Sequence, residues 1–185
     1  MNDHVKPESV SIILTSFNEG YHLDRILRDI YYQTYPSEAM EILLLEVGDY
    51  SEERARSILK ERSKRLRFLH IPGLSRTASL NKLVRDSKGG LIIRLDTRSH
   101  ISPEYTELIV KLSNEKNVAN VGGVQVPVGE TEDQERIALV MKHPVCFGGG
   151  KFRDLSYTGQ ANSVYLGAFR RKLMPPEPWF DEKYP

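Results

Sequence analysis

Three groups of acidic and polar side chains follow apolar runs in the first half of the sequence. The carboxyl ends of parallel strands meet at one edge of a sheet, and open α/β sheets bind their ligands there. If each run is such a strand, the three groups converge on one binding site, although they come from distant parts of the chain. The groups are Asn18 with Glu19, Glu46 with Asp49, and Asp96.

Asp96 ends an apolar run and is followed by Arg98 and His100. A carboxylate at this place is a ligand for Mg²⁺ or Mn²⁺, an acceptor for a ribose hydroxyl, or a cap for the turn before the next helix. The second carboxylate of a typical metal site is absent, whereas Arg98 offers a guanidinium that binds phosphate bidentately. His100 is either a nitrogen ligand or a solvated side chain.

Three further residues have one structural and one functional interpretation each. Phe17 ends the first run and either packs in the core or stacks on a nucleobase. Asn18 forms the following turn or hydrogen-bonds a base edge. Arg76 and Asn81 flank the start of a helix; Arg76 is either a surface residue or a phosphate contact supported by the positive helix end.

Strand and helix patterns alternate along the first two thirds of the chain, which predicts an α/β domain with an open, mostly parallel sheet and helices on both faces. A shorter helix, a glycine-rich loop and one strand with a basic end follow Pro127. The expected strands are 10–17, 41–47, 66–71, 91–96 and 118–126, and the expected helices are 20–33, 51–65, 75–87, 102–115 and 134–143, with Ser51 and Ser102 as N-caps and Pro103 at a first helical position.

Composition excludes several classes of protein. The 185 residues suit one domain, and 26 basic against 25 acidic residues give a net charge of +1, which offers no general attraction for nucleic acid. No apolar run reaches 18 residues, so we expect no membrane segment in this chain. Cys146 is the only cysteine, which favours a reducing compartment, the cytoplasm.

The motifs of other enzyme classes are missing. No G-x-G-x-x-G follows the first strand, as a dinucleotide-dependent dehydrogenase requires, and "TSFNEG" lacks the lysine-bearing loop of a nucleotidyltransferase. The stretch "CFGGGKFR" does not have P-loop spacing and is interpreted as a flexible loop over a ligand. Cys146 with His143 does not form a recognisable nucleophilic pair.

The order of motifs resembles family 2 glycosyltransferases, which are inverting enzymes of the GT-A fold. The similar segments are "VSIILTSFNEGYHLDRILRDIYYQTYP", "EILLLEVGDYSEE" and "SLNKLVRDSKGGLIIRLDTRSHISPEY". The later segments "NVGGVQVPVG", "FGGGKFR" and "VYLGAFRRKLM…WFDE" resemble the subgroup that builds succinoglycan-type bacterial exopolysaccharides.

The resemblance implies a nucleotide-sugar-binding half at about 1–126 and an incomplete acceptor half at about 127–185. It implies a nucleotide-diphosphate sugar as donor, with a UDP-sugar expected, and a saccharide or lipid-linked acceptor at the inner face of the plasma membrane. Asp96 matches the first acid of the family's D-x-D motif, near the ribose and a metal. The residues that would line the base pocket are Thr15, Phe17, Asn18, Glu19 and Glu46. Arg76, Asn81 and Arg98 are the other residues expected to contact the nucleotide sugar.

The chain departs from the family pattern at three places. Val47 replaces the second acid after the second strand, and Arg98 replaces the last acid of D-x-D, which puts a Mg²⁺ or Mn²⁺ cofactor in doubt and suggests that Arg98 replaces its charge. The family's general base follows the W-F-D-E segment, so we expect it beyond Pro185, in a longer enzyme. Uncovered apolar surface would then favour a homo-oligomer. The alternative is a non-catalytic nucleotide-sugar-binding paralogue or scaffold.

Overall fold

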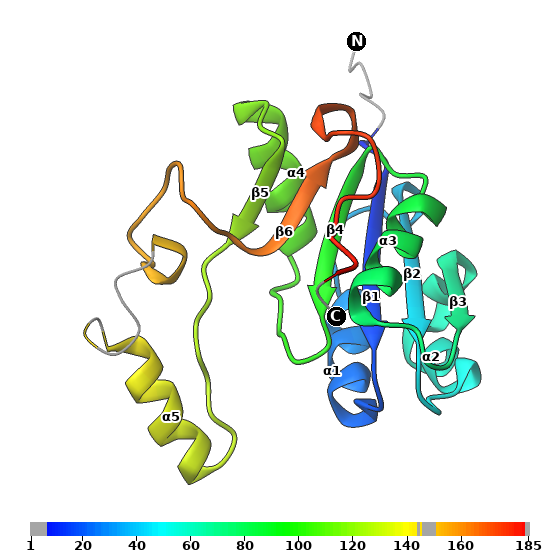
Figure 1. Ribbon diagram of the computed structural model, residues 1–185, viewed down its shortest axis with the longest axis horizontal. Coiled ribbons are helices and arrows are strands. Elements are labelled where there is room, and N and C mark those ends of the chain that lie inside the picture. The colour runs from blue at the N-terminus through cyan, green and yellow to red at the C-terminus, as the bar shows by residue number, and fades with distance from the viewer. Residues whose placement is uncertain (1–6, 144, 146–150, 184–185) are drawn as a thin grey trace. The chain divides into compact units, whose positions relative to one another are not determined.

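The computed structural model describes residues 7–143, 145 and 151–183 (Figure 1). The chain divides into two compact units. The first comprises Met1–Val121 and Ala168–Pro185, and the second comprises Gly122–Gly167. The first unit holds every candidate site residue named above.

A six-stranded sheet with the order β3-β2-β1-β4-β6-β5 organises the chain. Strands β3, β2, β1 and β4 are parallel to one another, and β6 runs antiparallel to β4. The predicted open, mostly parallel sheet is therefore confirmed. The strands are β1 (Val10–Ser16), β2 (Met40–Glu46), β3 (Leu66–His70), β4 (Leu91–Asp96), β5 (Asn120–Gly123) and β6 (Tyr165–Arg170).

Helices pack against the sheet, with α3 in front of it and α1 behind it in Figure 1. The caps of α2 and α3 are Ser51 and Ser75, whose hydroxyls accept from Arg54 N and Ala78 N at 3.2 Å. The helices of the described residues are α1 (Gly20–Tyr31), α2 (Glu52–Leu59), α3 (Arg76–Asp86), α4 (Tyr105–Lys116) and α5 (Glu132–Lys142), with short 3₁₀ segments at Ser37–Ala39, Lys60–Arg65, Lys151–Arg153 and Arg171–Leu173.

Two predicted helix boundaries were wrong by three residues or more. The charged helix ends at Leu59, because Lys60 adopts φ 48°, and the predicted remainder is 3₁₀. The fourth helix begins at Tyr105, so its N-cap is Glu104 rather than Ser102, and Pro103 is not its first residue. A side-chain hydrogen bond explains the second difference. Gln33 Nε2 donates to the carbonyl of Ser102 at 2.8 Å and thereby fixes the backbone at Ser102 to the residues that follow α1.

The core on one face of the sheet joins α3 to the strands and to the C-terminal segment. Leu80, Leu83 and Val84 of α3 pack with buried strand residues, and Trp179 and Phe180 pack against the same cluster. The segment after β6 therefore belongs to the core of the first unit. The strand residues are Ile13, Leu43, Leu45 and Ile92.

The second unit holds α5. In the same unit, Gln125 N donates to Phe152 O at 2.8 Å and joins the segments before and after α5. Most of the predicted glycine-rich loop, with Cys146, lies outside the described residues. None of the helices in the described ranges has the length and apolar character needed to cross a bilayer.

Candidate functional site

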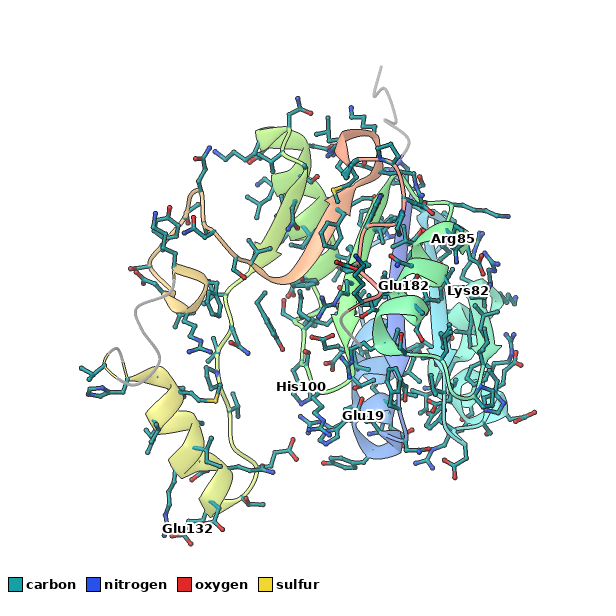
Figure 2. The ribbon with its side chains drawn as sticks, in the orientation of Figure 1. Glu19, Lys82, Arg85, His100, Glu132 and Glu182 are labelled. Atoms are coloured by element: carbon teal, nitrogen blue, oxygen red, sulfur yellow. The ribbon has the colours of Figure 1, made fainter. Side chains whose placement is uncertain are left out.

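The strand register brings the predicted acidic groups to one edge of the sheet. Ser16 is the register partner of Glu46, and Thr15 is the partner of Asp96. Figure 2 shows Glu19 and His100 at this carboxyl end. The convergence expected from sequence is therefore present in the first unit.

Glu46 organises the turns that follow β1 and β2. Its side chain is fully buried, and Oε1 accepts from Gly48 N at 2.6 Å and from Asn18 N at 3.4 Å. Asn18 adopts the left-handed conformation, with φ 59°, and its Oδ1 accepts from Asp49 N at 3.2 Å. A Cβ on Gly48 would lie 1.7 Å from that Oδ1, so only glycine fits without a shift of Asn18. His70 Nε2 lies 2.6 Å from Gly48 O and supports the same turn.

Two buried polar atoms at neighbouring register positions have no hydrogen-bond partner within the described residues: Ser16 Oγ and Glu46 Oε2. Such atoms cost free energy unless a ligand or water satisfies them. The pair therefore offers a carboxylate acceptor and a hydroxyl to a ligand at the sheet edge. Sequence reasoning missed Ser16, although its register opposite Glu46 follows from pairing the two predicted strands.

Asp96 lies between two guanidinium groups. Arg94 Nη2 donates to its two oxygens at 3.2 and 3.3 Å, and Arg76 Nη1 lies 3.9 Å from Oδ1. The Arg76 guanidinium also lies 5.3 Å from the centre of the Phe17 ring, which is partly exposed. The structure thus brings Arg76, Phe17 and Asp96 together, and Arg94 is an addition that the sequence analysis missed.

Glu19 binds the residues that follow β4. Its Oε1 accepts from Arg98 Nε at 2.8 Å, and its Oε2 accepts from the buried hydroxyl of Thr97. In this arrangement, Glu19 is occupied by protein groups. The guanidinium of Arg98 faces Glu19, and the side chain is 73% exposed.

His100 does not join Asp96. Its Nδ1 lies 3.0 Å from Asp29 Oδ2 of α1, and the same oxygen accepts from Ile101 N at 3.2 Å. The two predicted metal ligands therefore have different partners. In the part of the chain that the structure describes, no group of three or more His, Cys, Asp or Glu side chains is placed to hold a metal ion.

Asn81 clamps the C-terminal segment. Its amide donates to Phe180 O at 2.8 Å and to Glu182 Oε1 at 2.9 Å, and Phe180 N donates back to Asn81 Oδ1 at 3.0 Å. These bonds occupy both ends of the amide. The predicted contact with a nucleotide sugar would require their exchange.

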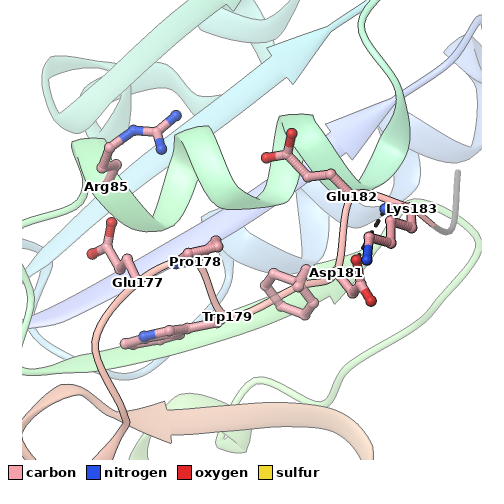
Figure 3. A pocket seen from close by; sticks show the side chains of 8 residues that line it. Arg85, Glu177, Pro178, Trp179, Asp181, Glu182 and Lys183 are labelled. Atoms are coloured by element: carbon pink, nitrogen blue, oxygen red, sulfur yellow. Dashed lines mark hydrogen bonds between the residues drawn. The ribbon is translucent and has the colours of Figure 1, made fainter.

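An open pocket of about 910 Å³ borders this clamp (Figure 3). Arg85 of α3 and Glu177 lie at one end of the pocket, and Asp181, Glu182 and Lys183 lie at the other. Its lining residues do not include those of the sheet edge, so it is a separate feature of the first unit.

Comparison with known proteins gives a consistent family. The model of "Glycosyl transferase family 2" matches residues 11–174. A Methanococcus voltae protein, named dolichyl N-acetyl-alpha-D-glucosaminyl phosphate 3-beta-D-2,3-diacetamido-2,3-dideoxy-beta-D-glucuronosyltransferase, is 22% identical over 175 residues, which cover 89% of this chain and 54% of that protein.

Two solved structures are similar in fold. The mannosyltransferase PcManGT of Pyrobaculum calidifontis, in complex with GDP-Man and Mn²⁺, matches with a TM-score of 0.60 at 17% identity, over 91% of this chain and 46% of its own. Staphylococcus aureus TarS with UDP-GlcNAc matches with a TM-score of 0.58 at 12% identity, over 66% and 36%. This chain thus spans about half the length of its relatives or less.

Proposed function

Because the chain belongs to glycosyl transferase family 2 and has the GT-A fold, we propose that its sheet edge binds a nucleotide-diphosphate sugar for transfer to a saccharide or lipid-linked acceptor. The observation that carries the proposal is the buried pair of unpartnered atoms, Glu46 Oε2 and Ser16 Oγ. A carboxylate acceptor in that position suits a base with a ring N–H, as in uracil, thymine or guanine. Adenine and cytosine present no such donor.

The other residues of the edge support a nucleotide in this position. Phe17 is partly exposed and offers a ring face to the base. Thr15 and Asp96 are register partners one residue before the Ser16–Glu46 pair, which supports a ribose on the β4 side of the base. Glu19 contributes by holding the chain after Asp96.

In the proposed reaction, an acceptor hydroxyl attacks the anomeric carbon and the bond to the diphosphate oxygen breaks. The electron pair leaves with the diphosphate, and the hydroxyl proton passes to a general base. Inversion follows from a single displacement. The family pattern places that base after the W-F-D-E segment, so we propose that residues beyond Pro185 supply it.

The biological setting is also part of the proposal. The resemblance to succinoglycan-type enzymes supports a role in bacterial exopolysaccharide or cell-surface synthesis, at the cytoplasmic face of the membrane. The printed name of the M. voltae relative specifies a dolichyl-phosphate-linked acceptor, which supports the lipid-linked alternative. A UDP-sugar is the proposed donor.

Calorimetric titration with UDP, dTDP, GDP, CDP and ADP tests the base site. We expect one of the first three to bind, and CDP and ADP to bind at least about tenfold more weakly, because a charged hydrogen bond is worth about 1.5–3 kcal/mol. Glu46→Gln should lower the affinity by a similar factor, whereas the exposed Glu53→Gln should not. Equal binding of all five, or of none, would contradict the proposal.

A non-catalytic nucleotide-sugar-binding scaffold is the second candidate. Val47 and Arg98 favour it, because each stands where the family pattern has an acid. Donor turnover separates the two functions. A glycosyltransferase releases nucleoside diphosphate from its UDP-sugar when the longer protein is supplied with an acceptor, whereas a scaffold binds the donor and releases none.

A further inference from the structure

The carboxylate of Asp96 lies between cations from two different elements, Arg94 of β4 and Arg76 of α3. One anion between two guanidinium groups leaves a local charge of +1. We propose that Arg94 and Arg76 form a metal-independent site for the diphosphate of the donor, a proposal that rests on the function proposed above for the same sheet edge. The diphosphate would replace Asp96 as the partner of the two guanidinium groups.

The residues around Asp96 do not fit a divalent cation. Mg²⁺ and Mn²⁺ prefer several oxygen ligands in close contact, and both oxygens of Asp96 face Arg94 Nη2 at 3.2 and 3.3 Å. A dication on either oxygen would lie within a few ångströms of a fixed positive charge. Arg98 and His100, at the places where further ligands would come from, are paired with Glu19 and Asp29.

Arg94 has unused capacity for hydrogen bonding. Its Nε is buried and has no partner within the described residues, while Nη2 makes the two bonds to Asp96. A guanidinium presents five N–H donors in a plane, a geometry that matches phosphate oxygens. A buried donor without an acceptor is costly, and a phosphate oxygen would satisfy it.

Arg76 occupies a position that disfavours a cation unless an anion is nearby. It is the first residue of α3, where the helix end carries a partial positive charge. The first turns of α2 and α5 carry the acids Glu52 and Glu132, as expected at this end, whereas the first turn of α3, like that of α1, contains no acid. Stacking on Phe17 holds the guanidinium near Asp96. The helix end and both arginines therefore present positive charge to one place.

The experiment is calorimetric titration of the chain with UDP and with inorganic pyrophosphate. Both ligands are titrated in EDTA, and UDP is also titrated in the presence of Mn²⁺. We expect UDP to bind in EDTA with an affinity within about twofold of that in Mn²⁺. Arg94→Met and Arg76→Met should each weaken both ligands by about tenfold or more. Arg136→Met, which removes an exposed arginine of α5, is the matched control and should have no effect.

Asp96→Asn distinguishes the arginine site from a metal site, because the two predict opposite changes in the affinity for pyrophosphate. If Asp96 competes with the diphosphate for the arginines, pyrophosphate binds as tightly or more tightly in EDTA. Arg94→Lys serves where Arg94→Met fails to fold; it retains the charge but loses the planar fork, and should still weaken binding.

Binding of UDP only in the presence of Mn²⁺, with its loss in Asp96→Asn, would overturn the arginine site and leave the proposed function intact. Binding of UDP that is equal in EDTA and Mn²⁺ but unchanged in Arg94→Met and Arg76→Met would also overturn it. Failure of every nucleotide to bind would overturn the proposed function, and the arginine site with it.

Discussion

Replacing Asn81 by alanine should detach the C-terminal segment from α3. The substitution removes three hydrogen bonds, two to the backbone of Phe180 and one to the Glu182 carboxylate. Asn81 is 2% exposed, but Phe180 is partly exposed, so water can reach part of what is left behind. At about 0.5–1.5 kcal/mol for each bond, the segment should lose about 2–4 kcal/mol of local stability.

Trp179 makes this loss measurable because it is the only tryptophan of the chain and lies in the clamped segment. In Asn81→Ala, its fluorescence should shift to the red at denaturant concentrations below the main unfolding transition, whereas in the parent protein the two transitions should coincide. Asn162→Ala, which changes an exposed asparagine, should behave as the parent. Coincident transitions and a change below about 0.5 kcal/mol in Asn81→Ala would refute the clamp.

Two further predictions concern the stability of the first unit. Burial alone would raise the pKa of Asp24, but hydrogen bonds from Arg54 and Tyr50 outweigh burial and lower that pKa below 3.8. The ionised carboxylate therefore stabilises the fold at pH values above the pKa that Asp24 has in the unfolded chain. This stabilisation is lost as the pH falls through the lower pKa of the folded protein. Asp24→Ala should lower the free energy of unfolding by about 1–3 kcal/mol at pH 7 and should weaken the fall of that free energy at acidic pH. Urea unfolding between about pH 2 and 7 measures this dependence, and the same dependence in variant and parent would exclude this role of Asp24. In Gly89→Ala, the new Cβ would lie 2.5 Å from the backbone nitrogen of Ser11, so denaturant unfolding should show a loss of about 1–3 kcal/mol; a stability equal to the parent's would mean that the backbone moves apart freely.

The sequence predicted the centre of the sheet well because the neighbouring parallel strands β1, β2 and β4 are mostly buried and appear as apolar runs. The run 91–96 matches β4 at both ends, 10–17 differs from β1 by one residue at its end, and 41–47 differs from β2 by one residue at each end. Helix boundaries were less predictable where a distant side chain decides them. Gln33 holds Ser102 from 69 residues away, and no pattern around Ser102 indicates that contact.

The partners of the site residues were harder to predict than their location. Arg98 was expected to act beside Asp96 because it lies two residues later, but β4 ends at Asp96 and the strand period of two no longer applies beyond it. The turn instead directs Arg98 to Glu19. Inside the strand the period does hold, so Arg94, two residues before Asp96, lies on the same face and bonds to it. The positive charge next to Asp96 thus comes from Arg94 rather than from Arg98. The alternation of side chains along "LIIRLD" already places Arg94 on the same face of the strand as Asp96.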